Sequence, residues 1–194
     1  AENIYLNEIS NDKYSYPSYQ GLIFIYLKDS RFNKAKYYLD EVFKLMPNDE
    51  RALFIASNYY LYIKDYEKAL SYVSKINNPN DNELLILSFI NYKLGKNYDL
   101  KTIESKSLQV INEGGNYYFE NPYLLLSQIY SIRNNKSEAY RWFDQAIDEG
   151  FSDYKLLLSN PLYDNIRGST TYNSLINKMK DHVDRERLEA GLES

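Results

Sequence analysis

Few side chains in this sequence have the types and spacing that catalysis needs. There is no Cys and only one His, so no site with thiolate ligands or with two imidazoles can form. That residue, His182, stands in a strongly charged stretch away from any nucleophile motif, which indicates a surface helix. Two pairs of adjacent carboxylates occur, Asp40-Glu41 and Asp148-Glu149. Neighbouring residues on a helix point about 100° apart, so these pairs predict a solvated face rather than an acid–base site.

Motifs for binding nucleotides or for an activated serine are also missing. The sequence has no P-loop, no G-x-G-x-x-G and no G-x-S-x-G, and Gly114-Gly115 is typical of a turn. Asn135-Lys136-Ser137 matches a glycosylation acceptor, but such triplets are common by chance and this one falls between two expected helices. We therefore predict a protein that is not an enzyme, with no catalytic residue, cofactor or metal.

Composition narrows the class of protein further. Of 194 residues, 44% are hydrophobic and 26% charged, which is typical of a globular chain and not of a disordered one. The net charge of −4 argues against nucleic-acid binding, and the longest apolar run, residues 22–27, is far shorter than the roughly 18 residues of a membrane span. Because the sequence opens at Ala1 with no leader, we expect a processed protein or an excised fragment. The compartment stays open, with the cytoplasm favoured over the periplasm.

The elements that must position any site come from an internal repeat. Tyr26 and Tyr60 are 34 residues apart, and so are Ala35 and Ala69. The interval from Tyr60 to Tyr130 is 70 residues, which leaves room for a longer unit anchored by Tyr92. The local patterns are Tyr19-x-x-Leu22-Ile23-x-x-Tyr26, Leu53-x-x-Ala56-Ser57-x-x-Tyr60, Leu85-x-x-Ser88-Phe89-x-x-Tyr92 and Tyr123-x-x-Leu126-Ser127-x-x-Tyr130.

Spacings of three and four place these residues on one face of a helix. Each pattern is followed by a polar turn and by a second helical segment, and in three of the four units that segment carries a small Ala. The sequence therefore predicts four helical hairpins, with helix pairs near 16–28 and 32–45, 50–62 and 66–77, 82–94 and 99–113, and 121–133 and 137–149.

Over residues 15–150 this pattern resembles the tetratricopeptide repeat (TPR), whose first helix carries a large residue, Leu, a small residue and Tyr, and whose second helix carries Ala and an aromatic residue. Departures from the consensus are Ile23, Ser57, Phe89 and Ser127 at the small position, and the missing Ala in the third unit. The resemblance implies an all-α, right-handed α-solenoid of about four TPR-like hairpins.

The segment after the last hairpin resembles the closing segment of bacterial TPR arrays. It runs from Leu156 through Asn160-Pro161-Leu162 to Arg167, and an amphipathic helix with Tyr172, Leu175, Ile176 and Met179 follows. The last hairpin of a solenoid exposes an apolar face that such a segment covers. We expect one domain, with a repeat array over 1–155 and a C-terminal cap and exposed helix over 156–194. TPR modules with similar endings occur in bacterial regulators and signalling enzymes.

In a TPR superhelix the first helices line a concave groove, and the resemblance assigns the groove-facing residues. The predicted peptide-binding residues are Gln20, Phe24, Phe54, Asn58, Tyr62, Phe89 and Gln128, with Leu27, Ile86 and Leu124 beside them. Phe54, Asn58 and Phe89 lead this set because central helices are the most enclosed. Cationic residues that clamp a peptide carboxylate in some TPR proteins are missing, since Gln20, Phe24, Ile55, Glu83 and Leu87 hold those positions.

The resemblance implies a non-catalytic protein-protein interaction scaffold, one module of a larger bacterial regulatory or signalling protein, that binds an apolar peptide or helix. Two alternatives stay open: a regulatory domain of an enzyme such as a kinase or cyclase, with catalysis elsewhere, and an envelope protein that handles glycans through some of its 22 Tyr. The groove residues could also serve as packing inside a narrow superhelix. Partner identity and oligomeric state are not predicted.

Overall fold

The computed structural model describes residues 2–47, 49–114, 121–189 and 191. Over these residues the protein is all-α, with eleven α-helices, one short 3-10 helix and no strand, and within each unit described below most consecutive helices pack antiparallel. The chain divides into two compact units, residues 1–98 (unit 1) and 99–194 (unit 2). Gly115, the second residue of the predicted Gly114-Gly115 turn, lies outside the described residues, as do Tyr117 and Tyr118.

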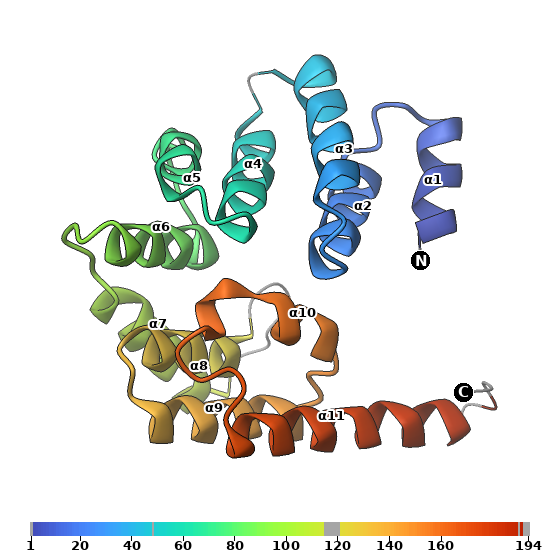
Figure 1. Ribbon diagram of the computed structural model, residues 1–194. Coiled ribbons are helices and arrows are strands. Elements are labelled where there is room, and N and C mark those ends of the chain that lie inside the picture. The colour runs from blue at the N-terminus through green and yellow to red at the C-terminus, as the bar shows by residue number, and fades with distance from the viewer. Residues whose placement is uncertain (1, 48, 115–120, 190, 192–194) are drawn as a thin grey trace. The chain divides into compact units, whose positions relative to one another are not determined.

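Unit 1 consists of six helices in chain order (Figure 1). Their bounds are α1 (Glu2–Asn11), α2 (Tyr16–Lys28), α3 (Phe32–Leu45), α4 (Glu50–Tyr62), α5 (Tyr66–Val73) and α6 (Asp81–Lys93). Helix α2 packs on α1, α3 and α4, and α4 packs on α5 and α6 as well. The first helices of the hairpins, α2, α4 and α6, therefore form one layer, and α1, α3 and α5 cover it.

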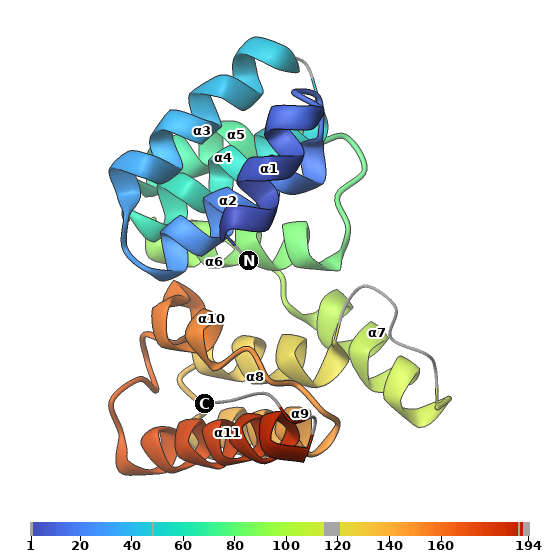
Figure 2. The same ribbon diagram turned by 90° about the vertical axis from the view of Figure 1, so that its right-hand side faces the viewer.

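Unit 2 contains the remaining helices, and in Figures 1 and 2 the long α11 runs beside α9. Their bounds are α7 (Lys101–Asn112), α8 (Pro122–Ile132), α9 (Lys136–Asp148), α10 (Tyr154–Ser159), the 3-10 helix η1 (Pro161–Tyr163) and α11 (Thr170–Glu189). Helix α8 is buried along most of its length, between α7, α9 and η1. It is the central helix of this unit.

The helices of the predicted hairpins are confirmed, and local signals explain where they begin. Asn121 accepts a hydrogen bond from the Leu124 amide at 3.1 Å and caps α8 ahead of Pro122. Asn80 and Glu83 form a reciprocal capping box at the start of α6. Helix α5 ends at Val73, four residues earlier than predicted, because the chain tightens into a turn before Pro79.

The hairpin turns share one backbone conformation, and this corrects the predicted register of the third unit. The residue four positions after Tyr26, Tyr60 and Tyr130 has a positive φ in each case, namely Ser30, Lys64 and Asn134. In the third hairpin Gly95 has this conformation, and the amide of Lys96 donates to the carbonyl of Asn91 at 2.8 Å, as the amide of Arg31 donates to Tyr26.

Asn91, and not Tyr92, is therefore the third equivalent of Tyr26, so the predicted anchor was wrong by one residue. The short-range spacing of three and four is the same in both registers, which is why the pattern alone could not separate them. In the corrected register Ser88 matches Ser57 and Ser127 at the small position, and Phe89 matches Asn58.

Helix α1 was not predicted. It packs on α2, and Tyr5, Leu6 and Ile9 face the core of unit 1. Gly21 lies directly beneath it, since a Cβ at this position would stand 2.4 Å from the Tyr5 ring. The close approach of the two helices therefore depends on a missing side chain.

The segment after α9 covers the apolar face of α8 and α9 within unit 2. Tyr163 and Tyr172 are buried against Phe143, with ring centroids 5.9 and 5.7 Å from it. Ser131 on α8 donates to the Leu162 carbonyl at 2.7 Å. Trp142, the single tryptophan, is buried on α9 beside Tyr123.

The last part of α11 extends beyond this packing. Met179 is its last buried residue, and the helix continues to Glu189 (Figure 1), in line with the expected exposed helix. The unit boundary at residues 98 and 99 falls between α6 and α7. The predicted division into a repeat array and a cap of one domain stays a prediction. Among the described residues, no helix is long and apolar enough to cross a membrane.

Candidate functional site

Five of the predicted groove residues come from α2 and α4 of unit 1. Gln20, Phe24 and Phe54 are partly exposed, whereas Asn58 and Tyr62 are 5% and 8% exposed. Asn58 donates from Nδ2 to the Phe54 carbonyl at 3.0 Å, so its amide group is engaged with its own helix. The side chains available to a partner on these two helices are therefore Gln20, Phe24 and Phe54.

Phe89 on α6 is 1% exposed. Its ring packs edge-on against Tyr66 of α5, with centroids 6.3 Å apart, and lies 6.3 Å from Tyr92. These contacts hold Phe89 between α5 and α6. We call the surface of Gln20, Phe24, Phe54, Asn58, Tyr62 and Phe89 the first-helix face; Leu27 and Ile86 next to it are buried.

Gln128, the remaining predicted residue, belongs to α8 in unit 2 and is 8% exposed, as is Leu124 on the same helix. It lies near the hydroxyl of Tyr163, whose pKa is raised by burial. That hydroxyl has no hydrogen-bond partner within the described part of the chain. Gln128 therefore lies in the core of unit 2, whereas the other six predicted groove residues belong to unit 1.

Three of the four carboxylates considered for catalysis form ion pairs with lysines. Asp40 pairs with Lys36, Glu41 pairs with Lys44, and Asp148 accepts from Lys178 at 2.6 Å. His182 lies on the exposed part of α11, beside a hollow of about 180 Å³. Among the described residues, no three His, Cys, Asp or Glu side chains are grouped so that they could hold a metal ion.

A cleft of about 400 Å³ opens between α1 and α3, over α2. Its lining includes Glu2 and Leu6 from α1 and Tyr26 from α2. The other residues come from α3: Asn33, Lys34, Tyr37 and Tyr38. These seven residues define what we call the α1–α3 cleft, which sequence reasoning missed because α1 was not predicted.

The carboxylate of Glu2 ties the two walls of this cleft together. It accepts from the Tyr26 hydroxyl at 2.9 Å and from the Arg31 guanidinium at 2.6 Å. Hydrogen bonds from Arg31 and Tyr26 lower the pKa of Glu2, so this carboxylate is ionised at neutral pH. Burial, together with the hydrogen bond to Glu2, raises the pKa of Tyr26, so its hydroxyl keeps its proton.

The same arrangement recurs in unit 2. The Tyr130 hydroxyl donates to Glu104 on α7 at 2.6 Å, and Arg133 donates to the other oxygen of that carboxylate at 2.8 Å. Burial alone would raise the pKa of Glu104, but the hydrogen bonds from Tyr130 and Arg133 outweigh it, and the pKa is lowered. The contact of α1 with α2 through Glu2 and Tyr26 thus has the same chemistry as the contact of α7 with α8 through Glu104 and Tyr130.

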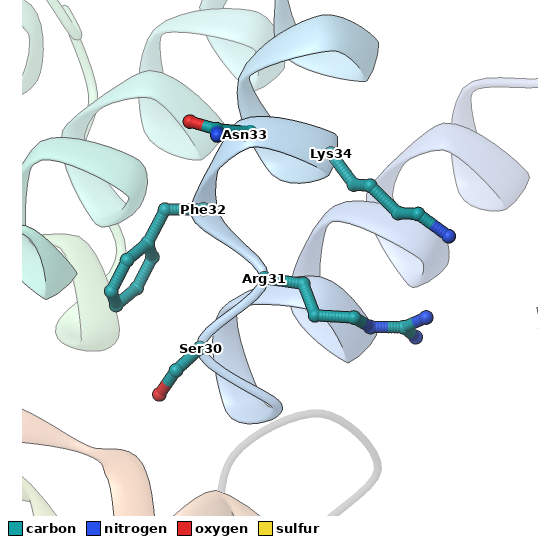
Figure 3. Close-up of a pocket in the computed structure, with 5 residues that line it drawn as sticks. All are labelled: Ser30, Arg31, Phe32, Asn33 and Lys34. Atoms are coloured by element: carbon teal, nitrogen blue, oxygen red, sulfur yellow. The ribbon is translucent and has the colours of Figure 1, made fainter.

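A second, smaller pocket of about 270 Å³ lies at the turn between α2 and α3 (Figure 3). Arg31 and Lys34 extend to one side of this turn and Phe32 extends to the other. The two cations thus point toward α1, where both meet Glu2.

Comparison with known proteins adds no family assignment. No protein-family model matches the chain, and no curated protein sequence matches it significantly.

Proposed function

We propose that the protein is a non-catalytic protein-protein interaction scaffold, a right-handed solenoid of TPR-like hairpins with a C-terminal cap, that binds an apolar peptide or helix on its first-helix face. The observation that carries the proposal is the recurrent hairpin turn, with its positive φ four residues after Tyr26, Tyr60, Asn91 and Tyr130. A repeated turn at equivalent positions is what an array of like hairpins requires.

Binding is assigned to the first-helix face because it presents two partly exposed aromatic side chains, Phe24 and Phe54, with Gln20 beside them. Aromatic anchors carry a large share of the energy in peptide recognition. Phe89 is the buried part of this face, where its ring packs against Tyr66 of α5.

The test is a selection of peptides from a displayed library against the full chain, followed by affinity measurements on variants. Phe24→Ala and Phe54→Ala are each expected to weaken the selected peptides by about tenfold or more. Tyr14→Ala, which truncates an aromatic side chain at a 59% exposed site outside the face, is the control. Variants that keep both their melting temperature and every selected peptide would disprove the assignment.

We also propose that the protein is one module of a larger bacterial regulatory or signalling protein. The full-length reading frame tests this part, since a kinase, cyclase or winged-helix segment upstream supports it and a secretion leader favours an envelope protein.

A further inference from the structure

We propose that the α1–α3 cleft is a second binding site, for an extended peptide segment in which an aromatic side chain and an acidic side chain stand two residues apart. The cleft belongs to the layer opposite the first-helix face, so it does not depend on the function proposed above. Its volume of about 400 Å³ lies within the roughly 300–1,000 Å³ usual for ligand sites.

The aromatic part of the proposal comes from Tyr37. Its side chain is 60% exposed, yet it is held in place, because its ring meets Tyr38 edge-on at 5.1 Å. Tyr38 is in turn stacked on Tyr26 at 5.6 Å. A rigid aromatic ring with one open side offers a stacking surface at little entropic cost.

The repeat itself does not require this ring. The position 34 residues after Tyr37 is Ser71, whereas Tyr26 and Tyr38 have tyrosines at the equivalent positions, Tyr60 and Tyr72. Tyr60 and Tyr72 stack in the same way, at 5.4 Å. The Tyr26–Tyr38 pair is therefore part of the hairpin packing, and the exposed Tyr37 is additional to it.

The acidic side chain of the proposed ligand is inferred from the polar groups of the cleft that can still form a hydrogen bond with a ligand. Both oxygens of Glu2 already accept hydrogen bonds from Tyr26 and Arg31. Lys34 is 58% exposed, and its Nζ lies 3.8 Å from Glu2, beyond hydrogen-bond distance. The ammonium group can thus donate to a ligand, and the carboxylate beside it is largely neutralised.

A cationic ligand fits this cleft less well. The Arg31 guanidinium and the Lys34 ammonium already lie 4.4 and 5.5 Å from the centre of the Tyr26 ring. A further cation would meet two like charges, whereas a carboxylate would complement them.

Spacing connects the two parts of the ligand. Lys34 and Tyr37 are three residues apart on α3, so they lie on the same face with Cβ atoms about 5–6 Å apart. In an extended peptide, residues i and i+2 point to the same side, about 7 Å apart. A Trp-x-Glu segment therefore places its ring on Tyr37 and its carboxylate on Lys34.

The experiment titrates the full chain by calorimetry with acetyl-Ser-Trp-Ser-Glu-Ser-amide and with two analogues, one with Gln for Glu and one with Ala for Trp. We expect Tyr37→Ala to weaken the parent peptide about tenfold. Lys34→Gln should weaken the parent peptide about two- to fivefold and leave the Gln analogue unchanged, because only the parent forms the ion pair.

Lys68→Gln is the matched control. Lys68 lies 34 residues after Lys34 and stands over Tyr60 as Lys34 stands over Tyr26, but it is paired with Asp65. Unaltered binding by the Lys68 variant, together with amide shifts at Asn33 and Lys34, would support the site. No saturable binding, equal affinity for the Glu and Gln peptides, or unchanged affinity of a folded Tyr37→Ala variant would overturn it.

Discussion

Gly21 shows how one missing side chain fixes the position of a helix. It lies inside α2, where Gly costs about 1 kcal/mol relative to Ala, so an ordinary Gly→Ala change there would stabilise the protein. A Cβ at this site would stand 2.4 Å from Cζ of Tyr5. The tyrosine ring of α1 occupies the space that a methyl group needs.

We expect Gly21→Ala to lower the free energy of unfolding by about 1–3 kcal/mol, because either the ring or the whole of α1 must move. The double variant with Tyr5→Ala removes the collision and should be more stable than the sum of the two single changes predicts. Urea unfolding of the four proteins measures this coupling. Additive effects would show that α1 does not pack on Gly21.

Two buried tyrosine hydroxyls in unit 2 differ in their hydrogen bonding. The Tyr172 hydroxyl donates to the Leu157 carbonyl at 2.8 Å, whereas the Tyr163 hydroxyl has no partner among the described residues. We expect Tyr172→Phe to cost about 0.5–1.5 kcal/mol of stability and Tyr163→Phe to be neutral or stabilising. Thermal melts of the two variants compare sites that share the neighbour Phe143. Equal losses would contradict the assignment.

At the scale of elements, we expect the docking of α1 to depend on pH. The pKa of Glu2 is lowered in the folded protein, so its stabilising effect is present above the pKa of the unfolded chain, about 4.3, and is lost as the pH falls through the folded value. The difference in unfolding free energy between wild type and Glu2→Gln should be constant from pH 7 to 6 and vanish at low pH. Glu67→Gln, at a 73% exposed carboxylate on α5, is the control. If the difference in unfolding free energy between wild type and Glu2→Gln is the same at every pH, the contact between Glu2 and Arg31 is not present in solution.

The C-terminal segment contains one part that packs and one that does not. Deleting residues 156–194 uncovers Phe143 and the buried side of α8, so we expect a large fall in melting temperature and solubility. Deleting only residues 180–194 should leave the melting temperature unchanged, because none of the described residues in this range is buried. If the longer deletion is equally harmless, the segment is not a cap.

The elements were predictable where a periodic apolar pattern coincided with a cap or a turn. The helices from α2 to α9 follow from spacings of three and four and from residues such as Asn80 and Asn121. The predicted register of the third unit was wrong because either Ser88 or Phe89 can stand at the small position of the pattern. Only the turn in which Lys96 donates to the Asn91 carbonyl distinguishes the two registers. Helix α1 has no cap signal or repeat partner, so tertiary contacts at Gly21 and Arg31 define it.

At the scale of the molecule, we expect a core mutation in one unit to destabilise that unit more than the other. Phe143 is fully buried in unit 2, and Phe143→Ala should cost about 3–5 kcal/mol there. Amide hydrogen exchange should then accelerate across residues 122–179 far more than across 16–62, because local unfolding is largely confined to the elements that lose packing contacts. Equal acceleration in both ranges would show a single cooperative domain, as the sequence predicted.

The candidate sites were less predictable than the fold. Burial of Asn58, Tyr62 and Phe89 depends on which neighbours each ring or amide meets, and the sequence does not specify those contacts. The α1–α3 cleft exists only when α1 is in place, and the sequence did not predict α1. The one sequence signal for this cleft was the presence of Tyr37 and Lys34 on the otherwise amphipathic helix α3.

The aromatic residues also give the molecule a built-in optical probe. Trp142 is the single tryptophan and lies in unit 2, whereas most of the 22 tyrosines lie in unit 1. Excitation energy passes from tyrosine to tryptophan with an efficiency that falls steeply with distance. Tryptophan emission after excitation of tyrosine, compared with emission after direct excitation, therefore reports the packing of Trp142 against its nearest tyrosines, such as Tyr123 with its ring centroid 6.1 Å away, without any added label.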